Sequence, residues 1–304
     1  MIAFDVDLNM KTSAWRLLLV LVVVFAMLPM ALAKIEVQDD AGKIVSVAKP
    51  ARRIVSLSPH ATELLFVAGA GPYVVGVAAY SDYPQAAGDI PRIGDASGLD
   101  LEKIVGLRPD LVVAWKSGNP PRVVRRLEEL GIPVFRSEPR NMTDIAENIE
   151  DLGMLANTLD VARRESANFR LRYSGLRSRY AHRKAVGVFY QIWHNPLMTV
   201  NGQHLISHVI QLCGGINVFS NLSTLTPQID IEAVLQANPT AIVAAGLNDS
   251  TVLHGWKKWT YVDAVKKNNL FLIPDNLIAR QSPRILDGAE QLCKVLEIAR
   301  STKK

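Results

Sequence analysis

One sequence motif occurs twice in this chain, and its second copy lies far downstream of the first. Each copy begins with Asp-Leu-Glu or Asp-Ile-Glu, at 100–102 and at 230–232. Pro109 and Pro239 follow at the same spacing, and an apolar run begins two residues after each proline. This pattern is typical of an N-capping aspartate, a short helix, a proline that marks its end and a buried strand. It predicts two lobes of similar build, although helix–proline–strand units also recur in α/β proteins generally.

The N-terminus predicts export from the cytoplasm. An uncharged apolar run at 18–30 follows two basic residues and precedes Ala31-Leu32-Ala33, the small-x-small pattern of a signal-peptide cleavage site. The run is short for a membrane-spanning helix, which needs about 20 apolar residues. We therefore expect a signal peptide over 1–33, cleavage after Ala33 and no membrane insertion of the mature chain. The acidic leader is unusual in a signal peptide, so translation starts either at Met1 or at Met10.

The charge pattern argues against nucleic acid as a partner. The net charge is +5, but the basic residues are spread out or lie beside acids, and no basic stripe with interleaved aromatic residues occurs. After cleavage about 270 of the 304 residues remain, which is enough for two domains.

Strands and helices alternate through the mature chain. In the first half the pattern predicts strands at 54–57, 74–79, 111–115 and 134–135, with helices from 58 and over 122–130. The second half repeats this order with a strand at 186–192, a helix at 205–212, a strand at 270–273 and a final helix over 283–300. Such alternation predicts an α/β fold with parallel, doubly wound, Rossmann-like sheets.

Residues 142–183 interrupt that alternation. Apolar residues keep helical spacing from Ile145 to Tyr180 without a proline, which predicts one long helix, or two nearly continuous ones. We expect this segment to join an N-terminal lobe (34–141) to a C-terminal lobe (184–304) as a stiff hinge. Two lobes joined in this way predict a ligand cleft between them.

Candidate ligand-binding residues lie where the predicted strands end, because doubly wound sheets bind ligands at the carboxyl ends of their strands. The candidates are Tyr80, Trp115, Trp193, Asn195 and the segment from Asn276 to Arg280. Aromatic residues at such positions can also simply close the core.

His204 and His208 lie one helical turn apart, the spacing of a metal-binding pair, but the glutamate of the zinc-protease helix motif is missing between them. Such a pair is more often structural or solvated, and we predict no metal, no cofactor and no catalytic residue. Cys213 and Cys293 both lie in the second half. They are expected either to form a disulfide that ties the last helix to its own lobe or to remain as two buried thiols.

Five segments together resemble the ABC-importer binding proteins for vitamin B12, haem and iron–siderophores. These are 53–65, 75–84, 98–115, 213–219 and 282–293, and the resemblance covers nearly all of the mature chain. It implies a monomeric, non-enzymatic periplasmic solute-binding protein that delivers a corrinoid (vitamin B12-like) ligand to an inner-membrane ABC permease dimer.

The resemblance also implies roles for single residues. Glu102 and Glu232 match the two acidic residues, one per lobe, that dock onto arginines of the permease. Tyr80, Trp115 and the segment from Asn276 to Arg280 match corrinoid-contacting positions. Cys213 and Cys293 match the family's disulfide.

Two departures keep other ligands open. Two cleft tryptophans of the cobalamin-binding members fall on Ala96 and Thr226 here, and large aromatic faces supply much of the contact with a flat macrocycle. Haem or a ferric siderophore is therefore the alternative. A siderophore would use Arg280, and haem would use an axial ligand from the set His60, His194 and Tyr80. A metal-dependent hydrolase built on His204 and His208 is the alternative from another class.

Overall fold

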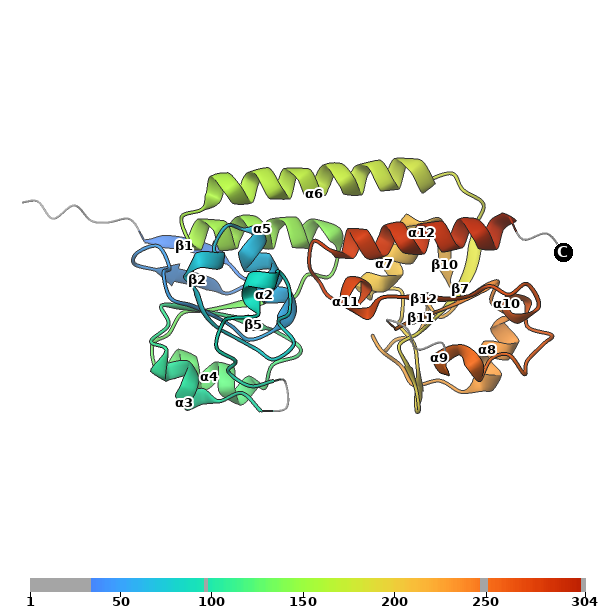
Figure 1. Ribbon diagram of the computed structural model, residues 1–304, viewed down its shortest axis with the longest axis horizontal. Helices are drawn as coiled ribbons and strands as arrows, with labels where there is room; N and C mark the ends of the chain where they lie inside the picture. The colour runs from blue at the N-terminus through green and yellow to red at the C-terminus, as the bar shows by residue number, and fades with distance from the viewer. Residues whose placement is uncertain (1–33, 96–97, 247–250, 302–304) are drawn as a thin grey trace, which may run out of the picture. The chain divides into compact units, whose positions relative to one another are not determined.

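The computed structural model describes residues 34–95, 98–246 and 251–301 (Figure 1). The predicted signal peptide, its cleavage site after Ala33 and the choice between Met1 and Met10 lie outside the described residues. From Ile35 on, two four-stranded sheets form the frame of the protein. Among the described residues, none of the helices combines the length and the apolar character needed to cross a membrane.

The N-lobe, defined here as the elements from β1 to β6, contains a fully parallel sheet in the order β4-β3-β5-β6. An antiparallel hairpin of β1 and β2 precedes it. The bounds of the strands are β1 Ile35–Gln38, β2 Ile44–Val47, β3 Ile54–Ser56, β4 Val74–Val77, β5 Leu111–Trp115 and β6 Val134–Ser137. The bounds of the helices are α2 Pro59–Val67, α3 Leu101–Gly106 and α4 Pro121–Glu129, with 3-10 turns at Gly71–Tyr73 and Gln85–Ala87.

The C-lobe, defined as the elements from β7 to α12, contains the second parallel sheet, in the order β10-β7-β11-β12. Its strands are β7 Val186–Gln191, β10 Gly215–Asn217, β11 Ala241–Ala245 and β12 Leu270–Ile273, with a small hairpin of β8 Trp193–His194 and β9 Leu197–Met198. Its helices are α7 Leu205–Leu212, α8 Ile231–Ala237, α9 Thr251–His254, α10 Asp263–Lys266, α11 Asp275–Ile278 and α12 Ile285–Ser301.

The two sheets have the same topology. If the strands of each sheet are numbered in chain order, both read 2-1-3-4. The repeated motif occupies the same place in both, because α3 leads into β5 and α8 leads into β11, the third strand of its sheet in each case. The predicted α/β class with two similar lobes is therefore confirmed.

The N-caps of the two motif copies differ. The side chain of Asp100 accepts a hydrogen bond from the backbone N–H of Lys103 at 2.9 Å, as expected for a capping aspartate. Asp230 occupies the N-cap position of α8 in an extended conformation, but its side chain makes no capping hydrogen bond. The predicted N-cap position is thus confirmed in both copies, whereas the side-chain capping hydrogen bond forms in the first copy and not in the second.

The segment 142–183 forms a helical hairpin rather than one nearly continuous helix. Helix α5 (Met142–Leu155) and helix α6 (Leu159–Tyr180) are joined by a short turn and lie side by side (Figure 1). The chain reverses at Asn157, whose φ of 52° lies in the left-handed region. The helices approach closely at Gly153, where a Cβ atom would come within 2.3 Å of the Cβ of Ala162. Only α6 therefore spans from one lobe to the other, and the boundaries at 141 and 183 stay predictions.

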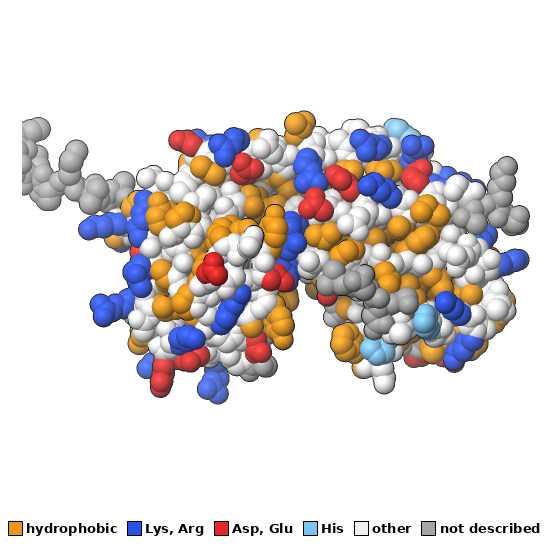
Figure 2. All heavy atoms as spheres, in the orientation of Figure 1, with side chains coloured by type: hydrophobic (Ala, Val, Ile, Leu, Met, Phe, Trp, Pro, Cys, Tyr) orange, Lys and Arg blue, Asp and Glu red, His pale blue; other side chains and the backbone are white. Residues whose placement is uncertain are grey.

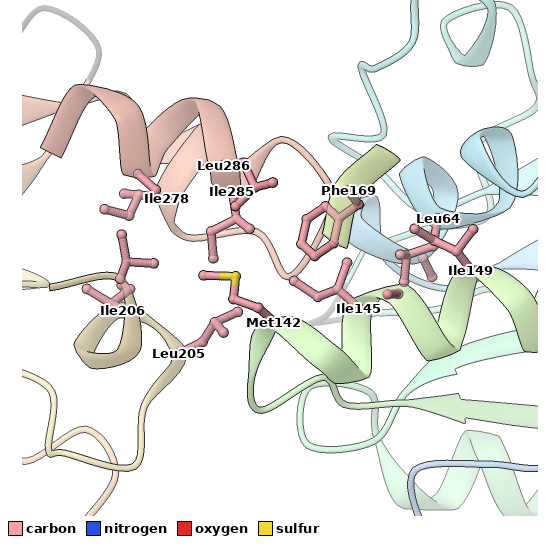
Figure 3. Packing of buried hydrophobic residues seen from close by; sticks show 14 of the residues in the cluster. Leu64, Met142, Ile145, Ile149, Phe169, Leu205, Ile206, Ile278, Ile285 and Leu286 are labelled. Carbon is pink, nitrogen blue, oxygen red and sulfur yellow. The ribbon is translucent and has the colours of Figure 1, made fainter. Parts of the chain in front are cut away.

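One hydrophobic core runs through both lobes and the helical hairpin. Figure 3 shows Met142 of α5 and Phe169 of α6 among apolar side chains of α7, α11 and α12, with Leu64 of α2 at the other end of the same cluster. Smaller separate cores lie in each lobe around Val112 and Ile242. Because the lobes share buried side chains, relative movement between them disturbs packing and is therefore restricted.

The disulfide between Cys213 and Cys293 is present. It joins the residue that ends α7 to the middle of α12, so it ties the last helix to its own lobe, as predicted.

Candidate ligand-binding site

Tyr80 and Trp115 lie together in the N-lobe: Tyr80 follows β4, and Trp115 ends β5. Both line a pocket of about 260 Å³, with residues that follow β3 and β4. Tyr80 is 75% exposed and has a φ of 63°, an uncommon conformation for a bulky residue. The backbone of Trp115 is fixed by Asn119, because the backbone N–H of Trp115 donates a hydrogen bond to Oδ1 of Asn119 at 2.6 Å. Gly118 is required here, since a Cβ atom would lie 1.9 Å from the Trp115 ring.

His60 packs against Trp115 edge to face, with ring centroids 5.6 Å apart. Burial, and then the positive charge of Arg280, lower the pKa of His60 from 6.5 to about 3, so the imidazole is neutral at physiological pH. Its Nδ1 lies 3.2 Å from the hydroxyl of Ser58. Within the described residues, Nε2 of His60 and Nε1 of Trp115 are buried without a hydrogen-bond partner. His60, which was predicted as a possible axial ligand of haem, is thus a buried and neutral side chain. Its role as a ligand stays a prediction.

Arg280 connects the two lobes. Its Nη1 donates to Oε1 of Glu63 at 3.0 Å and to Oδ1 of Asp82 at 2.6 Å, and its Nη2 donates to the carbonyl oxygen of Tyr80 at 3.2 Å. The three acceptors all belong to the N-lobe. Arg280 therefore fixes the backbone of Tyr80 from the opposite lobe, and any contact with a ligand stays a prediction.

Glu63 is the centre of this contact, which we call the inter-lobe latch (Glu63, Asp82, Arg280, Ser282 and Arg284). Oε2 of Glu63 accepts hydrogen bonds from the hydroxyl of Ser282 at 2.6 Å and from Nε of Arg284 at 2.9 Å, and Oε1 accepts from Nη2 of Arg284 at 2.6 Å. The Glu63 side chain is 1% exposed. Glu63 therefore forms a buried ion pair with the other lobe.

The remaining predicted residues belong to the C-lobe. Trp193 is 54% exposed on the β8–β9 hairpin, and its Nε1 donates to the carbonyl oxygen of Asn195 at 3.0 Å. The side chain of Asn195 is exposed. Asn276 lies in α11, and its Oδ1 is buried without a partner among the described residues. Tyr190, in contrast, is 1% exposed in β7 and closes the core.

A cavity with a volume of about 740 Å³ lies between the lobes. Figure 2 shows a notch in the surface between the two lobes, and on the face in view the basic side chains are spread out rather than gathered in one patch. The cavity is lined by Lys116, Ser117, Glu138, Pro139, Arg140 and Asn141 from the N-terminal side and by Gly202, Gln203, His204, Leu205, His208, Ser223, Leu225 and Gln281 from the C-lobe. The predicted ligand-binding residues are not in this lining, although Lys116 directly follows Trp115 and Gln281 directly follows Arg280.

His204 and His208 both face this cavity, which the sequence did not reveal. His204 is the N-cap of α7, and its Nδ1 accepts a hydrogen bond from the backbone N–H of Ile206 at 3.1 Å. The capping nitrogen must be unprotonated, so the neutral ring carries its proton on Nε2 and cannot ligate a metal through that atom in this state. The part of the chain that the structure describes contains no group of three or more metal-ligating side chains.

Glu102 and Glu232 occupy equivalent places in the two lobes. Each lies in the first turn of its helix, α3 or α8, and each is exposed. Neither carboxylate makes an ion pair with another described residue. Both helices lie on the side of the molecule away from α6 (Figure 1). Of the two positions where tryptophans of the cobalamin-binding members are missing, Ala96 lies outside the described residues and Thr226 is half-buried.

This arrangement of two similar lobes and a cleft defines a solute-binding protein, and the chain belongs to the periplasmic binding protein family, which it matches over residues 54–277. It is 37% identical over 253 residues to the vitamin B12-binding protein of Vibrio cholerae serotype O1, covering 82% of this chain and 91% of that one. It is 36% identical over 249 residues to the vitamin B12-binding protein of Yersinia pestis, covering 81% of this chain and 87% of that one.

Solved structures agree with this assignment. The crystal structure of the periplasmic vitamin B12-binding protein BtuF of Vibrio cholerae superimposes with a TM-score of 0.77 at 36% identity, covering 83% of this chain and 99% of that chain. The periplasmic heme-binding protein RhuT from Roseiflexus has a TM-score of 0.73 at 20% identity, covering 82% of this chain and 99% of that chain. At that identity the second likeness concerns the fold alone.

Proposed function

We propose that this chain is the binding component of an ABC importer for a corrinoid, a vitamin B12-like ligand. The observation that carries the proposal is the 37% identity to the vitamin B12-binding protein of Vibrio cholerae over 91% of that protein's length. Because the aligned region spans both lobes, it includes the residues on both sides of the cleft. The family's task is capture and delivery of a solute, so no catalytic residue is required.

The ligand lies between the lobes, with its flat ring against aromatic side chains. Tyr80 and Trp115 line one pocket of the N-lobe, and Lys116 continues from it into the 740 Å³ cavity. Trp193 offers a further exposed aromatic surface on the C-lobe. Aromatic faces contribute a large contact area with a macrocycle, and the polar lining of the cavity suits its peripheral amide groups. Asn195, Asn276 and Arg280 remain proposed contacts for these amides.

The cleft is largely formed before the ligand arrives. The shared core and the inter-lobe latch both connect the N-lobe to the C-lobe, so closure on a ligand involves small shifts rather than a wide hinge movement. A preformed site loses less conformational freedom on binding, which favours affinity.

Loaded protein docks onto an inner-membrane permease dimer through Glu102 and Glu232. Their equivalent positions in two similar lobes match a two-fold symmetric partner, and their carboxylates are free to pair with arginines across the interface. Exposed ion pairs of this kind set orientation and association rate more than affinity.

The mature protein is a periplasmic monomer that begins at Lys34 after removal of a signal peptide. The Cys213–Cys293 disulfide supports an oxidising compartment, where such bonds form and persist.

Calorimetric titration of the mature protein with cyanocobalamin tests the proposal, with haem and a ferric hydroxamate as parallel ligands. We expect one-to-one binding of cyanocobalamin alone. Binding of haem or the hydroxamate without cobalamin would retain the transport class and overturn the ligand. Absence of binding for all three, together with a metal-dependent hydrolytic activity that a His204→Ala variant loses, would overturn the class.

A further inference from the structure

The 740 Å³ cavity carries more positive than negative charge. Among the described residues, its lining contains two cationic side chains, Lys116 and Arg140, and one anionic side chain, Glu138. The carboxylate of Glu138 is partly satisfied within the protein, because Oε2 accepts a hydrogen bond from the backbone N–H of Ser117 at 2.8 Å. The excess of one positive charge favours a ligand group with a single negative charge.

Neither cation forms an ion pair with a carboxylate of another described residue. Nζ of Lys116 donates to the carbonyl oxygen of Asp40 at 3.1 Å, a neutral acceptor that leaves the ammonium charge intact. The backbone N–H of Arg140 donates to Oδ2 of Asp144 at 2.8 Å, whereas its guanidinium is exposed and makes no hydrogen bond within the described part of the chain. A planar guanidinium in this state is suited to bind two oxygens of an oxyanion at once.

A neutral donor faces them from the other lobe. Because Nδ1 of His204 accepts the hydrogen bond from Ile206, its remaining donor is Nε2–H. Burial, and then the nearby His208, lower the pKa of His204 to about 4, so this tautomer persists at periplasmic pH. The capping residues of α5 and α7, Asn141 and His204, both line the cavity, so the positive ends of two helix dipoles add to its potential.

The cavity that contains Lys116, Arg140 and His204 adjoins the aromatic pocket proposed for the corrin ring. Trp115 lines the aromatic pocket and the next residue, Lys116, lines the cavity. A corrin ring held against Trp115 therefore has its attached groups within reach of the cavity. In a complete cobalamin, one of those groups is a nucleotide loop with a phosphodiester, which has one negative charge.

We propose that Arg140 and Lys116, with Nε2–H of His204, bind the nucleotide-loop phosphodiester of the corrinoid and make the protein selective for complete cobalamins over corrinoids without that loop. This inference rests on the proposed function and concerns the same cleft. Arg140 and Lys116 determine specificity, while the aromatic residues hold the ring that both kinds of corrinoid share.

Titration of the exported protein with cyanocobalamin and with cobinamide, a corrinoid that lacks the nucleotide loop, tests this assignment. Arg140→Ala and Lys116→Ala should each weaken cobalamin binding about ten-fold, the effect of roughly 1.4 kcal/mol from one lost charge-assisted contact, and leave cobinamide binding unchanged within two-fold. Arg122→Ala removes the same charge from an exposed position on α4 outside the cavity and should change neither. Arg140→Lys should retain part of the affinity for cobalamin.

Equal weakening of both ligands, or no change in either, would overturn the phosphodiester assignment while leaving corrinoid binding intact. Failure of the unmodified protein to bind both corrinoids would overturn the proposed function and this inference together. Since Arg140 and Lys116 are exposed, the variants should fold, and matching thermal unfolding curves verify this.

Discussion

At the scale of single residues, the carboxylate of Glu63 accepts hydrogen bonds from three C-lobe side chains, Arg280, Ser282 and Arg284. A buried carboxylate of this kind is stable only while its partners remain, because loss of water around the charge is offset by those contacts. Its partners lie more than 200 positions downstream. Sequence spacing therefore could not identify the pairing.

Removal of Arg284 should leave the Glu63 charge buried with fewer partners. We expect Arg284→Ala to lower the free energy of unfolding by about 3–5 kcal/mol, measured by urea denaturation. Asp82→Ala is the control, because that latch carboxylate is 60% exposed and should contribute about 1 kcal/mol or less. Equal effects of the two substitutions would contradict the buried character of the latch.

His60 should make stability depend on pH. Its pKa is about 3 in the folded protein and about 6.5 ordinarily, so between these values the unfolded chain binds a proton that the folded chain does not. The free energy of unfolding should fall on acidification through this window, by about 1.4 kcal/mol per pH unit. The measurement is the difference in unfolding free energy between the unmodified protein and His60→Gln at several pH values.

Asp151 changes the free energy of unfolding in the opposite direction on acidification, so its contribution must be separated from that of His60. Burial, and then the charge of Asp40, raise the pKa of Asp151 to about 7, which favours the folded state as the pH falls from 7 toward 4. Since Asp151 is present in both proteins, its contribution cancels in the difference. A difference that does not vary with pH would contradict the neutral, buried state of His60.

Among the helices and strands, the predicted bounds are correct where a local sequence signal marks the end of the element. Helix α7 and strand β12 have the predicted bounds, and the Ser58-Pro59 start of α2 is confirmed by the capping hydrogen bond from Ala61. The reversal between α5 and α6 was missed because no proline or glycine marks it. Asn157 was the available signal, since asparagine tolerates the left-handed conformation that ends a helix.

The close contact within the helical hairpin gives a direct test of this reversal. Gly153→Ala should lower the free energy of unfolding by roughly 1–3 kcal/mol, because the added methyl group meets Ala162 at 2.3 Å. Gly175→Ala, at an exposed position of α6 with open space around it, should raise it by roughly 0.5–1 kcal/mol. Thermal or urea unfolding of both variants distinguishes them, and a neutral Gly153→Ala would argue against the hairpin packing.

At the scale of the whole molecule, the duplicated motif was the most informative part of the sequence. It led to two lobes with the same strand order and placed Glu102 and Glu232 in equivalent, exposed positions. A cleft between the lobes was predicted, but the residues that line its cavity could not be predicted in the same way. Its lining comes from loops and helix starts that only the packing of the two lobes brings together, and Arg140 has no distinctive motif.

Docking and ligand capture should be separable, because the two glutamates lie outside both pockets of the cleft. A Glu102→Ala, Glu232→Ala double variant should bind cobalamin with unchanged affinity and lose most uptake of labelled cobalamin by cells that depend on this protein. Glu36→Ala, which removes an exposed carboxylate from β1, serves as the control. Undiminished uptake by the double variant would show that docking uses another surface.

A crystal structure of the mature protein with bound cyanocobalamin would show directly where the ligand lies. We predict that the corrin ring lies between the two lobes against Tyr80 and Trp115, with its nucleotide loop toward Arg140 and Lys116. A ring bound outside this cleft, or held without contact to either aromatic side chain, would contradict the account.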